Sequence, residues 1–212
     1  LLWAFEGVTS YYDDLALLRS GAIERKDWLE LMGKTISNVL RTPGRLKQSL
    51  AESSFDAWSK FYRPDENTPN AVVSYYAKGA LFALALDLTL RAKTDGRVAL
   101  DDVMRALWER HGKTGIGVGE DDIRRIAEEC SGLKLKRLFA DGVSGTHDGR
   151  DHVAGRDFLE LFSGSFRGRV DCDREFLRSG LATDRDGGGQ RDSLGCLALG
   201  GLVDRAVSRD DA

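Results

Sequence analysis

The sequence has no apolar run long enough to cross a membrane and no excess of basic residues. Its longest apolar stretch, residues 80–90, has about half the length of a membrane-spanning helix and is interrupted by Asp87. The formal net charge is −3, whereas binding to nucleic acid calls for a basic face. We therefore expect neither a membrane span nor a nucleic-acid partner. The remaining balance, 42% hydrophobic and 31% charged residues, is that of an ordinary globular protein with a buried core.

Cysteine and histidine are scarce, which limits the metal sites that the sequence can form. They are Cys130, Cys172, Cys196, His111, His147 and His152. The cysteines are far apart and have no CxxC spacing, so we expect neither a disulfide framework nor a structural zinc site. No histidine has a second histidine four residues away, so the zinc-binding HExxH motif is absent.

The start of the chain also lacks two common features, an initiator methionine and the basic segment of an export signal. Leu1 opens directly into an aromatic, helix-like stretch. We therefore expect the chain to be part of a longer polypeptide, and its first residues give no evidence of the cellular compartment.

Apolar residues recur at three- and four-residue steps through the first two-thirds of the sequence, which is typical of helices. No alternating run of β-branched residues competes with this pattern. A polar loop with two prolines is expected at residues 63–70, and the most apolar helix should lie at the centre of the bundle. We predict an all-α helical bundle over residues 1–146. Its helices are expected near residues 2–20, 27–41, 54–61, 72–93, 100–110, 120–130 and 133–140.

The composition changes abruptly after residue 146. Residues 147–212 contain eleven glycines and ten arginines but no lysine, and Gly-Arg and Asp-Arg pairs recur there. One interpretation is a flexible, low-order Gly/Arg/Asp-rich tail. A sharper hypothesis is that this tail is translated out of frame from a GC-rich gene, and sequencing the parent DNA through codons 140–160 would decide between the two.

Glu6 is the first candidate for chemistry, because it stands among aromatic and apolar neighbours on the expected inner face of the first helix. A carboxylate there costs free energy unless it is paired or binds a cation. The adjacent Gly7 has no side chain and would let another backbone or a ligand approach. A metal ligand and an ordinary solvated glutamate are both compatible with these residues.

Two tyrosines, Tyr75 and Tyr76, are the second candidate, because they precede Lys78 and Gly79 at the start of the most apolar helix. A phenol near a helix N-terminus can donate a hydrogen bond to a developing oxyanion. The alternative is that both are core residues whose hydroxyl groups have ordinary partners.

Taken together, four blocks of the sequence resemble the glycyl aminopeptidase type of zinc metallopeptidase, a bacterial relative of aminopeptidase N within the gluzincins. The blocks occur in that family's order and span about residues 1–146. They are WAFEGVTSYYDD at residues 3–14, QSLAESSFDAW at 48–58, YRPDEN at 62–67 and VSYYAKGA at 73–80.

This resemblance implies the C-terminal part of a peptidase catalytic domain, with zinc as cofactor and peptides as substrates. In the family, an HExxH helix supplies two histidine ligands and a general base, and the glutamate of a downstream E-G motif supplies the third ligand. That glutamate corresponds to Glu6. The tyrosine of a Y-x-K-G motif, which stabilises the oxyanion, corresponds to Tyr76, with Tyr75 as the fallback.

The chain departs from the family pattern because HExxH is absent. By itself it is therefore expected to bind zinc poorly and to hydrolyse nothing, and the N-terminal remainder of the catalytic domain becomes its expected partner. The parent protein would remove small N-terminal residues, glycine foremost, and the family's export signals favour the bacterial periplasm or cell envelope. The alternative is a non-catalytic helical scaffold or interaction module derived from such a peptidase. The coding sequence upstream of Leu1 discriminates between them.

Overall fold

A computed structural model describes residues 1–146 of the 212-residue chain. The all-α prediction is confirmed, because this part of the chain consists of helices and connecting loops and contains no strand. The predicted tail, residues 147–212, lies outside the described residues. The elements are α1 (Leu2–Arg19), α2 (Arg25–Arg41), η1 (Pro43–Leu46), α3 (Leu50–Phe55), η2 (Ala57–Phe61), α4 (Thr68–Ala71), α5 (Tyr75–Lys93), α6 (Leu100–Leu107), η3 (Trp108–Gly112), α7 (Asp122–Ser131), α8 (Lys136–Phe139) and η4 (Ala140–Ser144).

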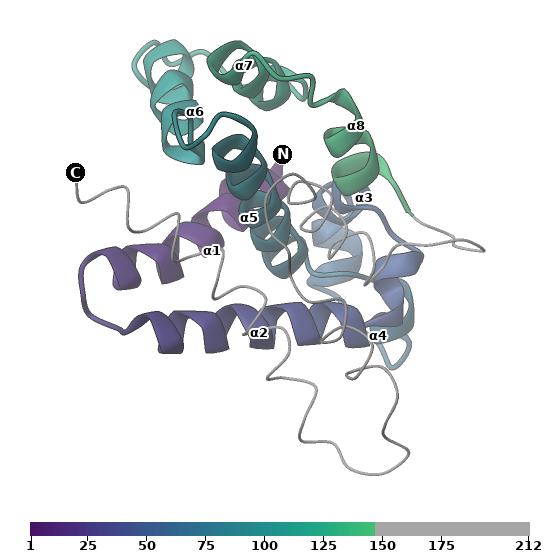
Figure 1. The fold of residues 1–212 in the computed structure, drawn as a ribbon. Coiled ribbons are helices and arrows are strands. Elements are labelled where there is room, and N and C mark those ends of the chain that lie inside the picture. Colours follow the sequence, from purple (N-terminus) through teal and green to yellow (C-terminus); the bar gives the residue numbers. More distant parts are fainter. Residues whose placement is uncertain (147–212) are drawn as a thin grey trace.

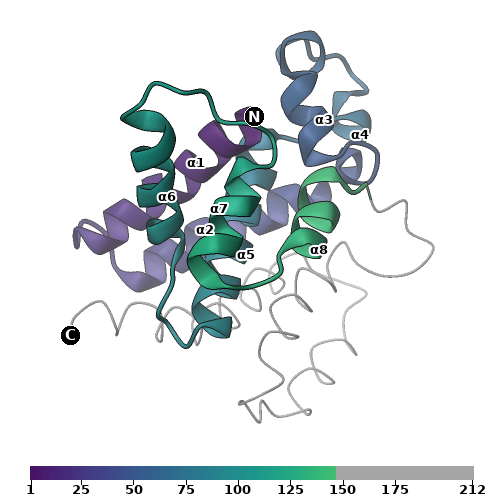
Figure 2. The same ribbon diagram turned by 90° about the horizontal axis from the view of Figure 1, so that it is seen from above.

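Helix α5 is the centre of the bundle, as its composition predicts. It lies between α2 on one side and α6, α7 and α8 on the other, and α1 crosses it (Figures 1 and 2). Residues 79–87 of α5 are buried without a break. The run Thr68–Lys93 is long and apolar enough to pass as a membrane span, but 72% of its apolar 18-residue window is buried inside the bundle. The hydrophobicity of this segment is therefore explained by its packing at the centre of the bundle, and we infer no membrane span from it.

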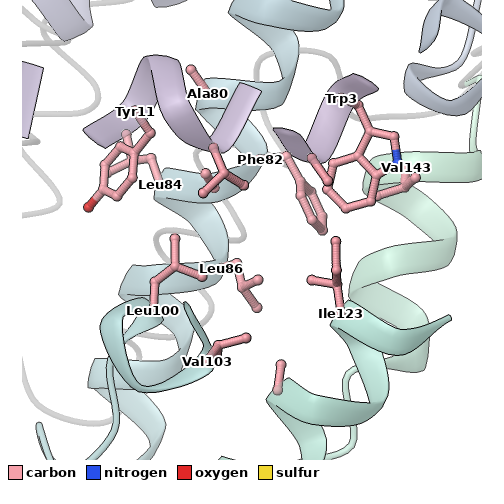
Figure 3. Close-up of a cluster of buried hydrophobic side chains, with 14 of the residues drawn as sticks. Trp3, Tyr11, Ala80, Phe82, Leu84, Leu86, Leu100, Val103, Ile123 and Val143 are labelled. Atoms are coloured by element: carbon pink, nitrogen blue, oxygen red, sulfur yellow. The ribbon is translucent and has the colours of Figure 1, made fainter. Parts of the chain in front are cut away.

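The core forms where α1, α5 and the last helices meet. Trp3 packs edge-on against Phe82 with ring centroids 5.4 Å apart, and Phe82 packs edge-on against Phe139 at 5.0 Å. Figure 3 shows Trp3 and Phe82 side by side in this cluster, with Val103 and Ile123 nearby. Aromatic side chains from three distant parts of the sequence thus fix the position of α1 on α5.

Several helix ends differ from the predicted ones, each for a local reason. The central helix begins at Tyr75 rather than at residue 72, because the Ser74 hydroxyl caps it by accepting a hydrogen bond from the Ala77 N–H at 3.2 Å. Helix α2 begins at Arg25 rather than at residue 27, because Glu24 precedes the helix and its N–H donates to the Asp27 carboxylate at 3.0 Å.

Two further differences affect the segment between α2 and α5. The short helix predicted near residues 54–61 begins at Leu50, where Ser49 caps it, and it continues after a break as the π-helical turn η2. The polar loop predicted at residues 63–70 contains the single-turn helix α4. Pro69 lies in the first turn of α4, where a missing N–H costs nothing, so the proline that suggested a loop is compatible with a helix.

A buried polar network joins α1, α5 and α6 at one end of the α1–α5 interface. The Asp87 carboxylate, which is 3% exposed, accepts hydrogen bonds from the Tyr11 hydroxyl at 2.8 Å and from the Leu100 N–H at 2.7 Å. Arg91 forms an ion pair with it at 3.1 Å. Burial first, and then the charge of Asp87, raise the pKa of Tyr11, so its hydroxyl remains a donor.

Candidate functional site

The candidate site begins where α1 and α5 cross at two glycines, Gly7 and Gly79. A Cβ added to Gly7 would lie 2.6 Å from the Cα of Gly79, and one added to Gly79 would lie 2.7 Å from the Trp3 carbonyl oxygen. Such distances leave no room for a side chain at either position. The sequence predicted that Gly7 lets another backbone or a ligand approach, and in the structure the backbone of α5 packs there.

This crossing brings the two sequence-predicted site residues to the same place. Glu6 precedes Gly7 on α1, and Tyr76 lies three residues before Gly79 on α5. The pKa of Tyr76 is raised, first by its hydrogen bond to Tyr62 and further by the negative charge of Glu6. Glu6 is half-buried rather than enclosed. Its carboxylate is therefore an electrostatic neighbour of the Tyr76 hydroxyl and still accessible from outside the bundle.

Three phenol groups meet beside Glu6. The Tyr62 hydroxyl lies 3.0 Å from that of Tyr75 and 3.1 Å from that of Tyr76, and the rings of Tyr75 and Tyr76 stack with centroids 4.5 Å apart. Hydrogen bonds from both neighbours lower the pKa of Tyr62. The pKa of Tyr75 is raised, mainly by burial and then by its hydrogen bond to Tyr62. The three hydroxyl groups thus form one hydrogen-bonded cluster with Tyr62 at its centre.

The two candidate tyrosines differ in access. Tyr75 is 1% exposed and packs against Phe61 with ring centroids 5.2 Å apart, whereas Tyr76 is only half-buried. A reacting group from outside the bundle can therefore approach the Tyr76 side chain more readily than the buried Tyr75 side chain. This difference in exposure favours Tyr76, the residue that corresponds to the tyrosine of the Y-x-K-G motif, over Tyr75.

Tyr62 was missed as a site residue by the sequence, which placed it only within a block of family resemblance. The π-helical turn η2 presents it toward α5, and its ring stacks on Trp58 with centroids 5.1 Å apart. Trp58 is 74% exposed and Tyr62 47% exposed. The sequence did offer one signal for Tyr62, because Trp58 and Tyr62 are two aromatic residues four positions apart beside a polar loop.

Helix α3 is held between the two helices that carry the site. The Trp3 N–H of α1 donates to the Ser54 hydroxyl at 3.0 Å, and the Ser53 hydroxyl donates to the Val73 carbonyl oxygen just before α5. Adjacent serines of one short helix therefore bond to α1 and to the approach of α5, which fixes the position of η2 and of Tyr62 after it.

Lys78, the lysine of the same motif, lies on α5 between Tyr76 and Gly79. Burial first, and then the positive charge of Arg45, lower its pKa to about 8. No carboxylate within residues 1–146 forms an ion pair with it. Lys78 is therefore an enclosed ammonium group without an acidic partner in the part of the chain that the structure describes.

The described residues do not by themselves form a metal centre. Within residues 1–146, no group of three or more histidine, cysteine, aspartate or glutamate side chains is arranged to hold a metal ion. At the glycine crossing, Glu6 supplies one carboxylate. The prediction that Glu6 is a zinc ligand stays a prediction, and so does the oxyanion role of Tyr76.

A second hollow lies away from this site, between η3 and α7. It has a volume of about 340 Å³ and is lined in part by Arg110, His111, Asp122 and Glu129. Arg110 pairs with Glu129 at 2.5 Å, and the His111 ring lies 3.8 Å from the Asp122 carboxylate. Its basic groups are paired with acidic ones, so nothing there favours a phosphate.

Comparison with known proteins finds a similarity to one peptidase family. Residues 1–82 match the family model of the M61 glycyl aminopeptidases, a range that includes Glu6, Gly7, Tyr76 and Gly79. A search of curated proteins found no match.

A solved structure, that of an aminopeptidase N family protein from Idiomarina loihiensis, is similar to this chain with 43% sequence identity and a TM-score of 0.67. The similarity covers 76% of this chain and 27% of that one, so the chain spans about a quarter of its relative's length. The chain is a relative of the M61 glycyl aminopeptidase family, which it matches over the residues that form the α1–α5 crossing and the tyrosine cluster.

Proposed function

We propose that residues 1–146 form one wall of the zinc cleft of an aminopeptidase that removes small N-terminal residues, glycine foremost, from peptides. The observation that carries this proposal is the reciprocal packing of Gly7 on Gly79, because it brings the turn of α1 that carries Glu6 against the turn of α5 that carries Tyr76. In the register of the family's motifs, Glu6 corresponds to the metal ligand and Tyr76 to the oxyanion donor. The family match over residues 1–82 supports the same assignment.

Zinc fits the described residues only in part. A tetrahedral catalytic site takes three protein ligands, and the described chain provides one carboxylate at the crossing. Glu6 would hold the metal together with two histidines from another part of a longer polypeptide. When bound there, zinc would polarise the scissile carbonyl group and activate a water molecule.

The residues of this chain would contribute orientation and hydrogen bonding. Because its pKa is raised, Tyr76 keeps its proton near neutral pH, and its hydroxyl can donate to an oxyanion that forms on the carbonyl group. Tyr62 holds that hydroxyl in place at 3.1 Å in the absence of substrate. In the reaction, the Tyr76 O–H would turn from Tyr62 toward the new oxyanion, while Tyr62 keeps its contact with Tyr75.

Two measurements test the proposal. The coding sequence upstream of Leu1 should contain an in-frame HExxH; an unrelated sequence there would favour the alternative, a non-catalytic helical scaffold. In the longer polypeptide, Glu6→Ala should lower the zinc content measured by elemental analysis. Asp13→Ala is the matched control, because Asp13 is an exposed carboxylate on the same helix. Full zinc occupancy in the Glu6 variant would remove Glu6 from the site.

A further inference from the structure

Two stacked aromatic rings lie exposed beside the tyrosine cluster, on η2. Trp58 is 74% exposed and Tyr62 is 47% exposed, and their rings stack with centroids 5.1 Å apart and an angle of 28° between the ring planes. We call these two side chains the aromatic shelf. Tyr62 covers one face of the indole, and the high exposure of Trp58 leaves its other face open. An open aromatic face of this kind is apolar surface that a ligand can cover.

Contacts within η2 fix the position of the shelf. Ala57, the first residue of η2, is fully buried, and the Tyr62 N–H donates to its carbonyl oxygen at 3.0 Å. The Lys60 ammonium group pairs with the Asp56 carboxylate at 2.6 Å across the same turn. The Tyr62 ring also packs edge-on against Phe61 with centroids 5.3 Å apart. Because the rings are already held in place, a ligand that stacks on them does not have to order them first.

Tyr62 joins the shelf to the proposed site. Its hydroxyl group lies 3.1 Å from that of Tyr76, while its ring stacks on Trp58. One side chain thus contacts the proposed oxyanion donor at its polar end and the open indole along its ring. The shelf is therefore continuous with a site that has to stay open for a substrate, which favours the substrate as its occupant over another part of the longer polypeptide.

The chemistry of the proposed substrate indicates which of its groups covers the shelf. This step rests on the proposed function, in which the first residue of the peptide is glycine and its carbonyl group lies at Tyr76. Glycine has no side chain, so it cannot cover the indole. The second residue follows about 3.5 Å further along an extended peptide. Its side chain is therefore the first one of the substrate that can lie on the shelf.

We propose that Trp58 and Tyr62 form the subsite for the second residue of the peptide and favour an aromatic side chain there. A phenylalanine ring stacks on the open face of Trp58 in the offset arrangement that aromatic pairs prefer. Trp58 contacts no reacting group and acts on the choice of substrate. The substrate class is then peptides in which an aromatic residue follows an N-terminal glycine.

The longer polypeptide can be tested with two dipeptide amides that share their first residue, glycyl-phenylalanine amide and glycyl-alanine amide. The wild type should hydrolyse the phenylalanine substrate with a kcat/KM about tenfold higher. The difference should lie mainly in KM, because stacking on the shelf is present before and during the reaction and so acts on binding. Steady-state kinetics on both amides measures this preference.

Three variants assign the preference to the shelf. Trp58→Ala should remove most of it by raising KM for the phenylalanine substrate, and since Trp58 is exposed, the fold should stay intact. Tyr62→Phe keeps the ring and should keep the preference. Trp108→Ala is the matched control, because Trp108 is an exposed tryptophan on another π-helical turn, η3, and its loss should leave the preference unchanged.

The possible failures can be told apart. Equal kcat/KM for the two amides in the wild type, or a preference that Trp58→Ala leaves unchanged, would overturn the subsite and leave the proposed function in place. A Trp58→Ala protein with a lower Tm and an unchanged preference would show that another part of the polypeptide covers the shelf. Hydrolysis of neither amide would contradict the proposed function itself, and the subsite with it.

Discussion

The two ends of the α1–α5 interface are built in opposite ways. At the Asp87 end, every oxygen of a buried carboxylate has donors, from Tyr11, Arg91 and Leu100. At the Gly7–Gly79 end, the helices touch through bare backbone, and Glu6 has no ion-pair partner within residues 1–146. The first arrangement stabilises the fold, whereas the second leaves a carboxylate and a phenol accessible to a ligand. The Asp87 end is thus structural, whereas the open end is where the proposed site lies.

The largest effect on stability should come from the saturated end. Asp87→Ala removes the carboxylate that pairs with Arg91 and accepts the Leu100 N–H. Breaking a buried ion pair from one side costs about 3–5 kcal/mol, because the remaining charge stays buried. Urea unfolding of the 212-residue chain measures this loss. Asp13→Ala, at an exposed position of α1, should change the free energy of unfolding by less than about 0.5 kcal/mol. Similar losses for both variants would contradict the contrast between the two ends.

The open end should instead carry the largest effect on catalysis. In the longer polypeptide with its HExxH helix, Tyr76→Phe should lower kcat by about 10²-fold or more, as loss of an oxyanion donor does. Tyr75→Phe removes the hydroxyl of a side chain that is 1% exposed, so it should leave kcat within about tenfold. Steady-state kinetics on a glycine-terminated chromogenic substrate compares the two. If Tyr75→Phe has the larger effect on kcat, the assignment moves to Tyr75.

The glycine crossing itself can be tested by adding one methyl group. Gly7→Ala places a Cβ 2.6 Å from the Gly79 Cα, which is backbone and cannot turn away. The helices must separate, at a cost of about 1–3 kcal/mol, as in other overpacked cores. Gly117→Ala is the matched control, since no atom lies within 4 Å of the added carbon there. Unfolding midpoints that fall equally in both variants would show that the close approach is not required.

The sequence predicted the helical fold and named Glu6 and Tyr76 as candidates, but it did not show how the elements that carry them come together. The periodicity identified the central helix, and motif register identified Glu6 and Tyr76. The sequence near residues 6 and 76 does not indicate that they lie close together. Their proximity depends on the packing of two glycines that are 72 positions apart. Tyr62 was missed for the same reason: its hydrogen bonds to Tyr75 and Tyr76 depend on η2 and α3, whose ends the pattern did not define.

The smallest effect concerns Lys78 and depends on pH. Its pKa is lowered to about 8 in the folded chain, against 10.5 for an ordinary lysine, by burial and by Arg45, with Glu52 acting in the opposite sense. Below pH 8 both the folded and unfolded states bind the proton, so the full cost of burying the charge is present. Between pH 8 and about 10.5 the unfolded state binds more protons, so stability rises with pH as this cost is lost.

Lys78→Met should therefore stabilise the chain by about 1–2 kcal/mol at pH 7, allowing for the solvent that still reaches the group. The gain should shrink toward zero near pH 10.5, whereas Lys93→Met should show no such trend in unfolding measured at several pH values. A gain that is constant with pH would mean that Lys78 stabilises or destabilises through packing alone and carries no buried charge.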